Sequence, residues 1–159
     1  PSMGDVRLMD ASSQYVYFRD HRPRWFGDTD VTYYRAAVSS PKSRFVATAK
    51  LPSVMRVWES TAYFTDYSAR AIYSVWVGGG TPSKLVDTVG APACLGVGER
   101  WVVWCTSHGV YAVRRQGGSP KLVAVDHEPA AVAVDGDLVY WVSAARVGRV
   151  RLPGACGEL

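Results

Sequence analysis

Apolar and polar residues alternate with a period of two along most of the chain, in short runs separated by turn residues. This alternation is typical of β-strands that bury one face. Between residues 94 and 130 it predicts four strands, at 94–97, 101–106, 109–114 and 121–125. Glycine, serine and proline occupy the turns, as their backbone preferences favour. The pattern therefore predicts an all-β protein of short strands and tight turns.

One six-residue phrase occurs four times, at 15–20, 61–66, 101–106 and 138–143. Its fourth position always holds a large aromatic residue: Phe18, Phe64, Trp104 and Trp141. Successive copies are 46, 40 and 37 residues apart, which predicts a chain of tandem repeats.

A second phrase follows the first at a matching offset in two copies. The run 72–75 leads to a Gly-Gly-Thr-Pro turn at 79–82, and the run 110–113 leads to a Gly-Gly-Ser-Pro turn at 117–120. Glycine permits positive φ in such a turn, and proline fixes its own φ. The two phrases divide the chain into four units, of which the last is short: 4–53, 54–93, 94–130 and 131–159.

Tandem four-stranded units of this length are characteristic of β-propeller blades. A single blade is too small to bury both of its faces, so the recurring aromatic is expected to fill the gap between neighbouring blades. The first unit is longer because residues 21–30 are inserted between its second and third strands. The predicted fold is one β-propeller-like domain of four blades over residues 1–159, with the last blade incomplete.

The run Tyr63-Phe64-Thr65-Asp66 resembles the YWTD-type propeller repeat, which the other units match more loosely as YFRD, VWCT and YWVS. The units are also similar to bacterial propeller repeats of the virginiamycin lyase-like and NHL-like groups. This resemblance covers nearly the whole chain and implies a propeller that binds other molecules, as most members of these groups do. It also slightly favours an extracellular or periplasmic location. YWTD propellers typically close with six blades, whereas this chain carries four units.

Composition and charge narrow the range of partners that the protein is expected to bind. A chain of 159 residues is the length of one domain. Lysine plus arginine exceed aspartate plus glutamate by 18 to 14, but the basic residues are scattered, whereas nucleic-acid binders concentrate them. No apolar stretch approaches the ~20 residues that span a bilayer. We therefore expect neither a nucleic-acid partner nor membrane insertion.

The three cysteines are Cys94, Cys105 and Cys156, and none has the spacing of a metal site. A hairpin around residues 98–101 would place Cys94 opposite Cys105, at a hydrogen-bonded position of the ladder. The Cα atoms of such a pair are farther apart than at the neighbouring positions. The spacing is therefore compatible both with a disulfide and with a pair of buried free thiols.

In a propeller, the turns between second and third strands share a face with the links between blades. By that logic polar residues of all four units, including the three histidines, gather on one face. The candidate ligand-binding residues are His21, Arg22, Arg24, Trp25, Asp66, Arg70, His108, His127, Glu128 and Arg146. Trp25, in the inserted segment beside two arginines, suits recognition of a protein or a carbohydrate. Ordinary solvated loops are the alternative interpretation.

We expect a non-catalytic binding module or assembly scaffold, without a cofactor or metal, that recognises a protein partner or associates with itself. An incomplete last blade leaves an unpaired strand edge, which favours association through the ends. The first alternative is a glycan-binding propeller, with a sugar stacked on Trp25. The second is a hydrolase or lyase in which His108, His127 and Glu128 meet as an acid–base site.

Overall fold

The computed structural model describes residues 5–21, 30–40, 42–50, 54–144 and 146–154. Within these ranges the chain forms fifteen strands in four antiparallel sheets. The first sheet contains β1 (Asp5–Ala11), β2 (Tyr15–His21), β3 (Asp30–Ala37) and β4 (Ser43–Lys50). The second contains β5 (Met55–Trp58), β6 (Thr61–Asp66), β7 (Ala71–Trp76) and β8 (Ser83–Asp87).

The third sheet contains β9 (Cys94–Val97), β10 (Trp101–Thr106), β11 (Gly109–Arg114) and β12 (Lys121–Val125). Among the described residues, the fourth contains only β13 (Ala131–Asp135), β14 (Leu138–Val142) and β15 (Val147–Arg151). Each sheet pairs its strands in chain order. The predicted all-β class and the incomplete last unit are confirmed, and the strands of the third sheet have the predicted bounds.

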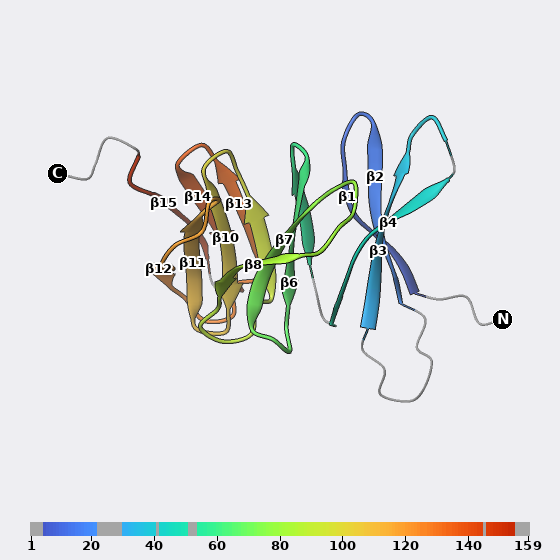
Figure 1. The fold of residues 1–159 in the computed structure, drawn as a ribbon. Coiled ribbons are helices and arrows are strands. Elements are labelled where there is room, and N and C mark those ends of the chain that lie inside the picture. Colours follow the sequence, from blue (N-terminus) through green and yellow to red (C-terminus); the bar gives the residue numbers. More distant parts are fainter. Residues whose placement is uncertain (1–4, 22–29, 41, 51–53, 145, 155–159) are drawn as a thin grey trace.

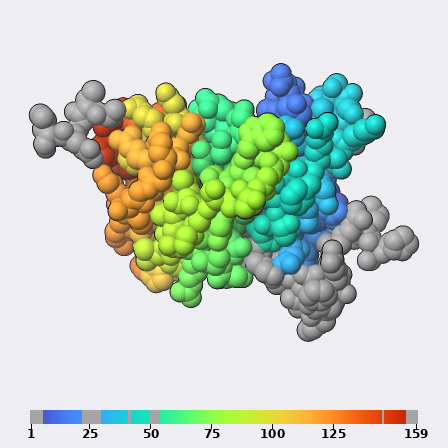
Figure 2. Space-filling model, viewed as in Figure 1, coloured from blue at the N-terminus to red at the C-terminus, as the bar shows by residue number. Residues whose placement is uncertain are grey.

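The four sheets lie side by side in chain order, with the first and the fourth at opposite ends of the molecule (Figure 1). Their first strands are neighbours along this row: β1 contacts β5, β5 contacts β9, and β9 contacts β13. The space-filling view shows the first sheet in blue and cyan, the second in green and the third in yellow to orange as successive contacting layers, with part of the red C-terminal region at the left edge (Figure 2). The described residues thus form an open arc.

Three hydrophobic clusters occupy the three spaces between consecutive sheets. Phe64 belongs to the first cluster, Trp104 to the second and Trp141 to the third, and each is at most 8% exposed. The predicted packing role of the recurring aromatic is therefore confirmed for these three residues. Phe18 differs: it is half-buried, belongs to none of the clusters, and stacks on Tyr34 with ring centroids 5.7 Å apart.

A β-bulge recurs between the third and fourth strands of each four-stranded sheet. The extra residue on the fourth strand is Val46 in the first sheet, Leu85 in the second and Val123 in the third. A bulge increases the local twist of the strand that carries it. The repeat therefore extends to an irregularity of the backbone, which the apolar pattern alone did not indicate.

Candidate functional site

The predicted loop face brings the turns and links together as expected. The turn between β6 and β7 contacts the link after β8, where the Thr88 amide donates to the Arg70 carbonyl at 2.7 Å. The turn between β10 and β11 contacts the link after β12, where the Glu128 amide donates to the Ser107 carbonyl at 3.4 Å. His108 therefore lies in a turn that adjoins the segment of His127 and Glu128.

The side chains of these residues make local contacts at the surface. His108 Nδ1 lies 2.9 Å from Ser107 Oγ, and Asp66 Oδ1 accepts from the Ala69 amide at 2.8 Å. Arg70 and Glu128 occupy turn positions with φ of 49° and 51°. His108, His127 and Glu128 are all exposed. Within the described ranges, no group of three His, Cys, Asp or Glu residues could hold a metal ion.

Some of the predicted site residues lie outside the described residues. His21 is the last residue of β2, whereas Arg22, Arg24 and Trp25 lie outside the described residues. The predicted recognition role of the inserted segment therefore stays a prediction. No helix in the described part of the chain is long and apolar enough to cross a membrane.

Arg146 takes part in a hydrogen-bonded cluster between the third and fourth sheets. Asp126 Oδ2 accepts from Trp141 Nε1 at 2.7 Å and from Arg146 Nε at 3.0 Å, and Arg146 Nη2 also donates to the Val125 carbonyl at 2.9 Å. The hydrogen bond from Trp141, followed by that from Arg146, lowers the pKa of the Asp126 carboxyl. This geometry satisfies a buried indole N–H and gives Arg146 a structural role.

A second cluster of the same composition joins these two sheets elsewhere along their length. Asp137 accepts from Trp101 Nε1 at 3.2 Å and from Arg100 Nη2 at 3.0 Å. In the first cluster the fourth sheet supplies Trp141, and the link after the third sheet supplies Asp126. In the second, the third sheet supplies Trp101, and the turn between β13 and β14 supplies Asp137. Neither cluster was predicted from the sequence, because each pairs residues from different repeats.

Cys94 and Cys105 form a disulfide across the β9–β10 pair, with Cα atoms 5.1 Å apart. They are register partners, as the hairpin count predicted, and the distance lies within the usual range for disulfides. Of the two alternatives left open, the structure contains the disulfide. Cys156 lies outside the described residues.

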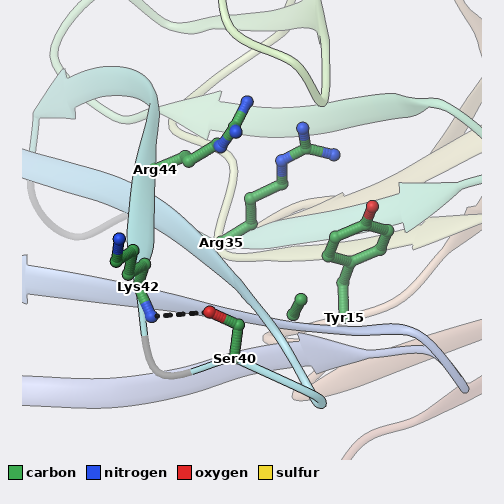
Figure 3. A pocket seen from close by; sticks show the side chains of 6 residues that line it. Tyr15, Arg35, Ser40, Lys42 and Arg44 are labelled. Atoms are coloured by element: carbon green, nitrogen blue, oxygen red, sulfur yellow. Dashed lines mark hydrogen bonds between the residues drawn. The ribbon is translucent and has the colours of Figure 1, made fainter.

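A cavity of about 300 Å³ lies on the first sheet, away from the predicted loop face, and it is lined by Tyr15, Arg35, Ala37, Ser40, Lys42 and Arg44. Arg35 Cζ lies 4.7 Å from the centroid of the Tyr15 ring. Figure 3 shows the side chains of Arg35 and Arg44 extending in the same direction, with the Tyr15 ring next to Arg35. This basic cavity was not predicted from the sequence, because its residues come together only when β3 pairs with β4.

No family model and no curated protein matches the chain. Solved structures do match, with low identity. The computationally designed Ika4 protein has a TM-score of 0.74 at 12% identity, over 96% of this chain and 94% of that one. A gluconolactonase from Xanthomonas campestris has a TM-score of 0.68 at 14% identity, over 92% of this chain and 56% of that one.

A chain of a nidogen/laminin complex matches with a TM-score of 0.61 at 14% identity, over 94% of this chain and 77% of that one. These are propeller proteins, and the four sheets correspond to their blades. The fold is a β-propeller fold. At such low identity the likeness establishes the fold alone, and this chain spans about half the length of the gluconolactonase. The four sheets are hereafter blades 1 to 4 in chain order.

Proposed function

We propose that the protein is a non-catalytic binding module and assembly scaffold that associates through the outer faces of blades 1 and 4. One observation carries the proposal: the aromatic pair that packs two of the three internal blade interfaces recurs on the outer face of blade 1, where no blade among the described residues covers it. This face is called the head face, and the outer face of blade 4 is called the tail face.

The internal interfaces define what such a face packs against. Phe64 and Tyr73 are cross-strand partners, stack with centroids 5.7 Å apart, and pack in the cluster shared with blade 1. Trp104 and Tyr111 do the same at 5.8 Å in the cluster shared with blade 2. In both blades the pair faces the preceding blade.

The head face presents the equivalent pair to the outside. Leu8, Phe18, Tyr34 and Phe45 are successive cross-strand partners, so they form one row over all four strands of blade 1. Leu8 is 70% exposed and Phe45 is 51% exposed. Scattered exposed apolar residues are ordinary, but a continuous apolar row points to an interaction surface.

The tail face presents the complementary side of the same interface. Tyr140 occupies the repeat position of Tyr17 and Tyr63, which are 2% and 4% exposed where the following blade covers them. On blade 4 that position is only half-buried. A cavity of about 190 Å³ with an almost wholly apolar lining lies there, and Val147 at its edge is 76% exposed.

The occupant that fits both faces is a second copy of the chain. The head face resembles the internal surfaces that pack on a preceding blade, and the tail face resembles those that pack on a following one. Two copies placed head to tail about a two-fold axis would form two identical junctions and close a ring of eight blades. A different protein partner on either face is the alternative outcome.

The absolute mass in solution tests this proposal. Light scattering after size exclusion should give about 35 kDa, twice the 17.4 kDa of one chain, decreasing towards 17.4 kDa on dilution. Leu8→Asp and Val147→Asp should each reduce the mass to that of one chain, because each places a charge in an apolar junction. Circular dichroism should show that both variants remain folded, since both side chains are largely exposed.

Leu122→Asp is the matched control. Leu122 is 54% exposed and is the partner of Tyr111 in blade 3, as Phe45 is the partner of Tyr34 in blade 1, but it lies on neither end face. This variant should keep the mass of the wild type. A wild-type mass of 17.4 kDa at every concentration tested would contradict self-association, as would equal effects of all three variants.

The proposal assigns no catalytic role to the loop face. An acid–base site needs its groups within hydrogen-bonding reach of one bound substrate, usually in a cleft. His108, His127 and Glu128 are exposed, and the cavities described above are lined by other residues. These features favour binding over chemistry.

A further inference from the structure

Three basic side chains surround the cavity on blade 1. Arg35 lies on β3, Arg44 lies on β4, and Lys42 lies in the turn just before β4. The ion pairs found among the described residues include none of the three. The cavity therefore concentrates positive charge, with no carboxylate of the described residues at ion-pair distance from the three side chains.

The polar groups closest in the strand register leave that charge in place. Asp10 and Tyr17 lie on the same cross-strand row as Arg35. Asp10 accepts from the Ala11 amide at 2.8 Å and from the Val57 amide at 2.7 Å, so its oxygens serve the backbone. Burial raises the pKa of Tyr17, against the Arg35 charge that lowers it, so the phenol stays neutral.

Arg35 is held in place but lacks a full set of acceptors. Its guanidinium packs on the Tyr15 ring, which restricts the side chain, and its Nε is buried with no hydrogen-bond partner among the described residues. Buried donors are nearly always paired, so an unpaired one indicates a missing acceptor. A preorganised guanidinium also binds an anion at a lower entropic cost.

Blade 3 contains a similar arrangement in which the acceptor is present. Arg114 packs on Trp101 with Cζ 4.0 Å from the ring centroid, and Lys121 lies beside them. There Arg114 Nη2 donates to the Pro153 carbonyl at 3.2 Å, and blade 4 thus supplies part of the cavity wall. The described residues that line the cavity on blade 1 all belong to blade 1.

We propose that the cavity on blade 1 binds a tetrahedral oxyanion, the phosphate or sulfate group of a ligand. Guanidinium groups match the geometry of phosphate oxygens and donate charge-assisted hydrogen bonds to them. Arg35 and Arg44 supply such donors, Lys42 supplies a third positive charge, and the hydroxyls of Tyr15 and Ser40 line the same cavity. Three cations suit a group with two negative charges better than a single carboxylate.

The test is a titration of the ¹⁵N-labelled full chain with inorganic phosphate, followed by amide chemical shifts at constant ionic strength. Phosphate should shift the amides of residues 15, 35, 40, 42 and 44 in a saturable manner, and acetate should not. Arg44→Gln should weaken phosphate binding about tenfold, the loss expected for one charge-assisted hydrogen bond. Lys42→Gln should weaken it less, because an exposed ammonium acts only as a point charge.

Lys121→Gln is the matched control, since Lys121 is an exposed lysine at the similar cavity of blade 3. It should leave phosphate binding unchanged. Equal weakening by Arg44→Gln and Lys121→Gln, equal shifts with acetate, or no saturable shift around residues 35–44 would each overturn the proposal.

Titrations with sulfate and with O-phosphoserine identify the source of the group. Tighter binding of the phosphomonoester than of either free anion indicates a phosphorylated ligand, whereas equal binding indicates an inorganic anion. None of these measurements depends on the association of the end faces. A failure of either proposal therefore leaves the other unaffected.

Discussion

At the residue scale, two aspartates join blades 3 and 4 through hydrogen bonds. Asp126 and Asp137 each accept from a tryptophan indole and from an arginine at the interface between blades 3 and 4. Trp101 is 1% exposed and Trp141 is 8% exposed, so their N–H groups need protein acceptors. Charged residues at this interface therefore stabilise blade packing.

The lowered pKa of Asp126 predicts a pH-dependent stability. Hydrogen bonds from Trp141 and then Arg146 favour the ionised carboxyl, so its folded pKa lies below the ordinary value of 3.8. A group of this kind stabilises the fold at pH above that value, and the contribution is lost as pH falls below it. The urea midpoints of wild type and Asp126→Asn should therefore differ by a constant amount near about pH 6 and approach each other as the pH falls below about 4.

Asp87→Asn is the control for this experiment, because Asp87 forms an exposed ion pair with Lys84, and such pairs contribute little. Its midpoints should follow those of the wild type. A difference between wild type and Asp126→Asn that stays constant on acidification would rule out this role for the carboxyl.

At the element scale, the cross-strand aromatic row differs in blade 4. The partner of Trp141 on β15 is Gly148, where blades 1 to 3 have Tyr34, Tyr73 and Tyr111. A Cβ atom at Gly148 would lie 2.2 Å from Cζ2 of the Trp141 ring. The glycine therefore provides the space in which the indole lies over Gly148 and donates to Asp126.

Gly148→Ala should consequently destabilise the protein by about 1–3 kcal/mol, the usual cost of overpacking. The indole would have to move, which should also change the tryptophan emission of the folded state. Arg149→Ala, at the exposed neighbouring position, should stay within about 0.5 kcal/mol of the wild type. Denaturant unfolding monitored by fluorescence measures both, and equal stability of Gly148→Ala and wild type would disprove the packing argument.

The sequence was sufficient to predict the elements because alternation and turn residues are local signals. The four strands between residues 94 and 125 follow from the alternation and the turn residues. The register of Cys94 with Cys105 follows from counting residues along one hairpin. Features that depend on pairing between distant segments could not be found that way. The Asp126–Trp141 bond and the cavity around Arg35 arise only when strands or blades come together.

At the scale of the whole molecule, position in the arc overrides the repeat. The pattern assigns Phe18 the same role as Phe64, yet of the two only Phe64 packs against a preceding blade among the described residues. Nothing in the local sequence distinguishes the two. Arg22, Arg24 and Trp25 lie outside the described residues, so the roles predicted for them stay predictions.

The head and tail faces are different surfaces, which gives any association between copies a polarity. Leu8→Asp disrupts only the head face, and Val147→Asp disrupts only the tail face. Each variant therefore keeps one end face that can still bind another copy. An equal mixture should therefore recover a two-chain species of about 35 kDa, joined at a single junction, that neither variant forms alone. Light scattering of the mixture checks this, and a mass of 17.4 kDa would mean that the two ends are not complementary. If the two ends are complementary, a chain with one substituted end face can join other copies only through its unchanged face. Such a chain would therefore prevent both ring closure and the growth of filaments.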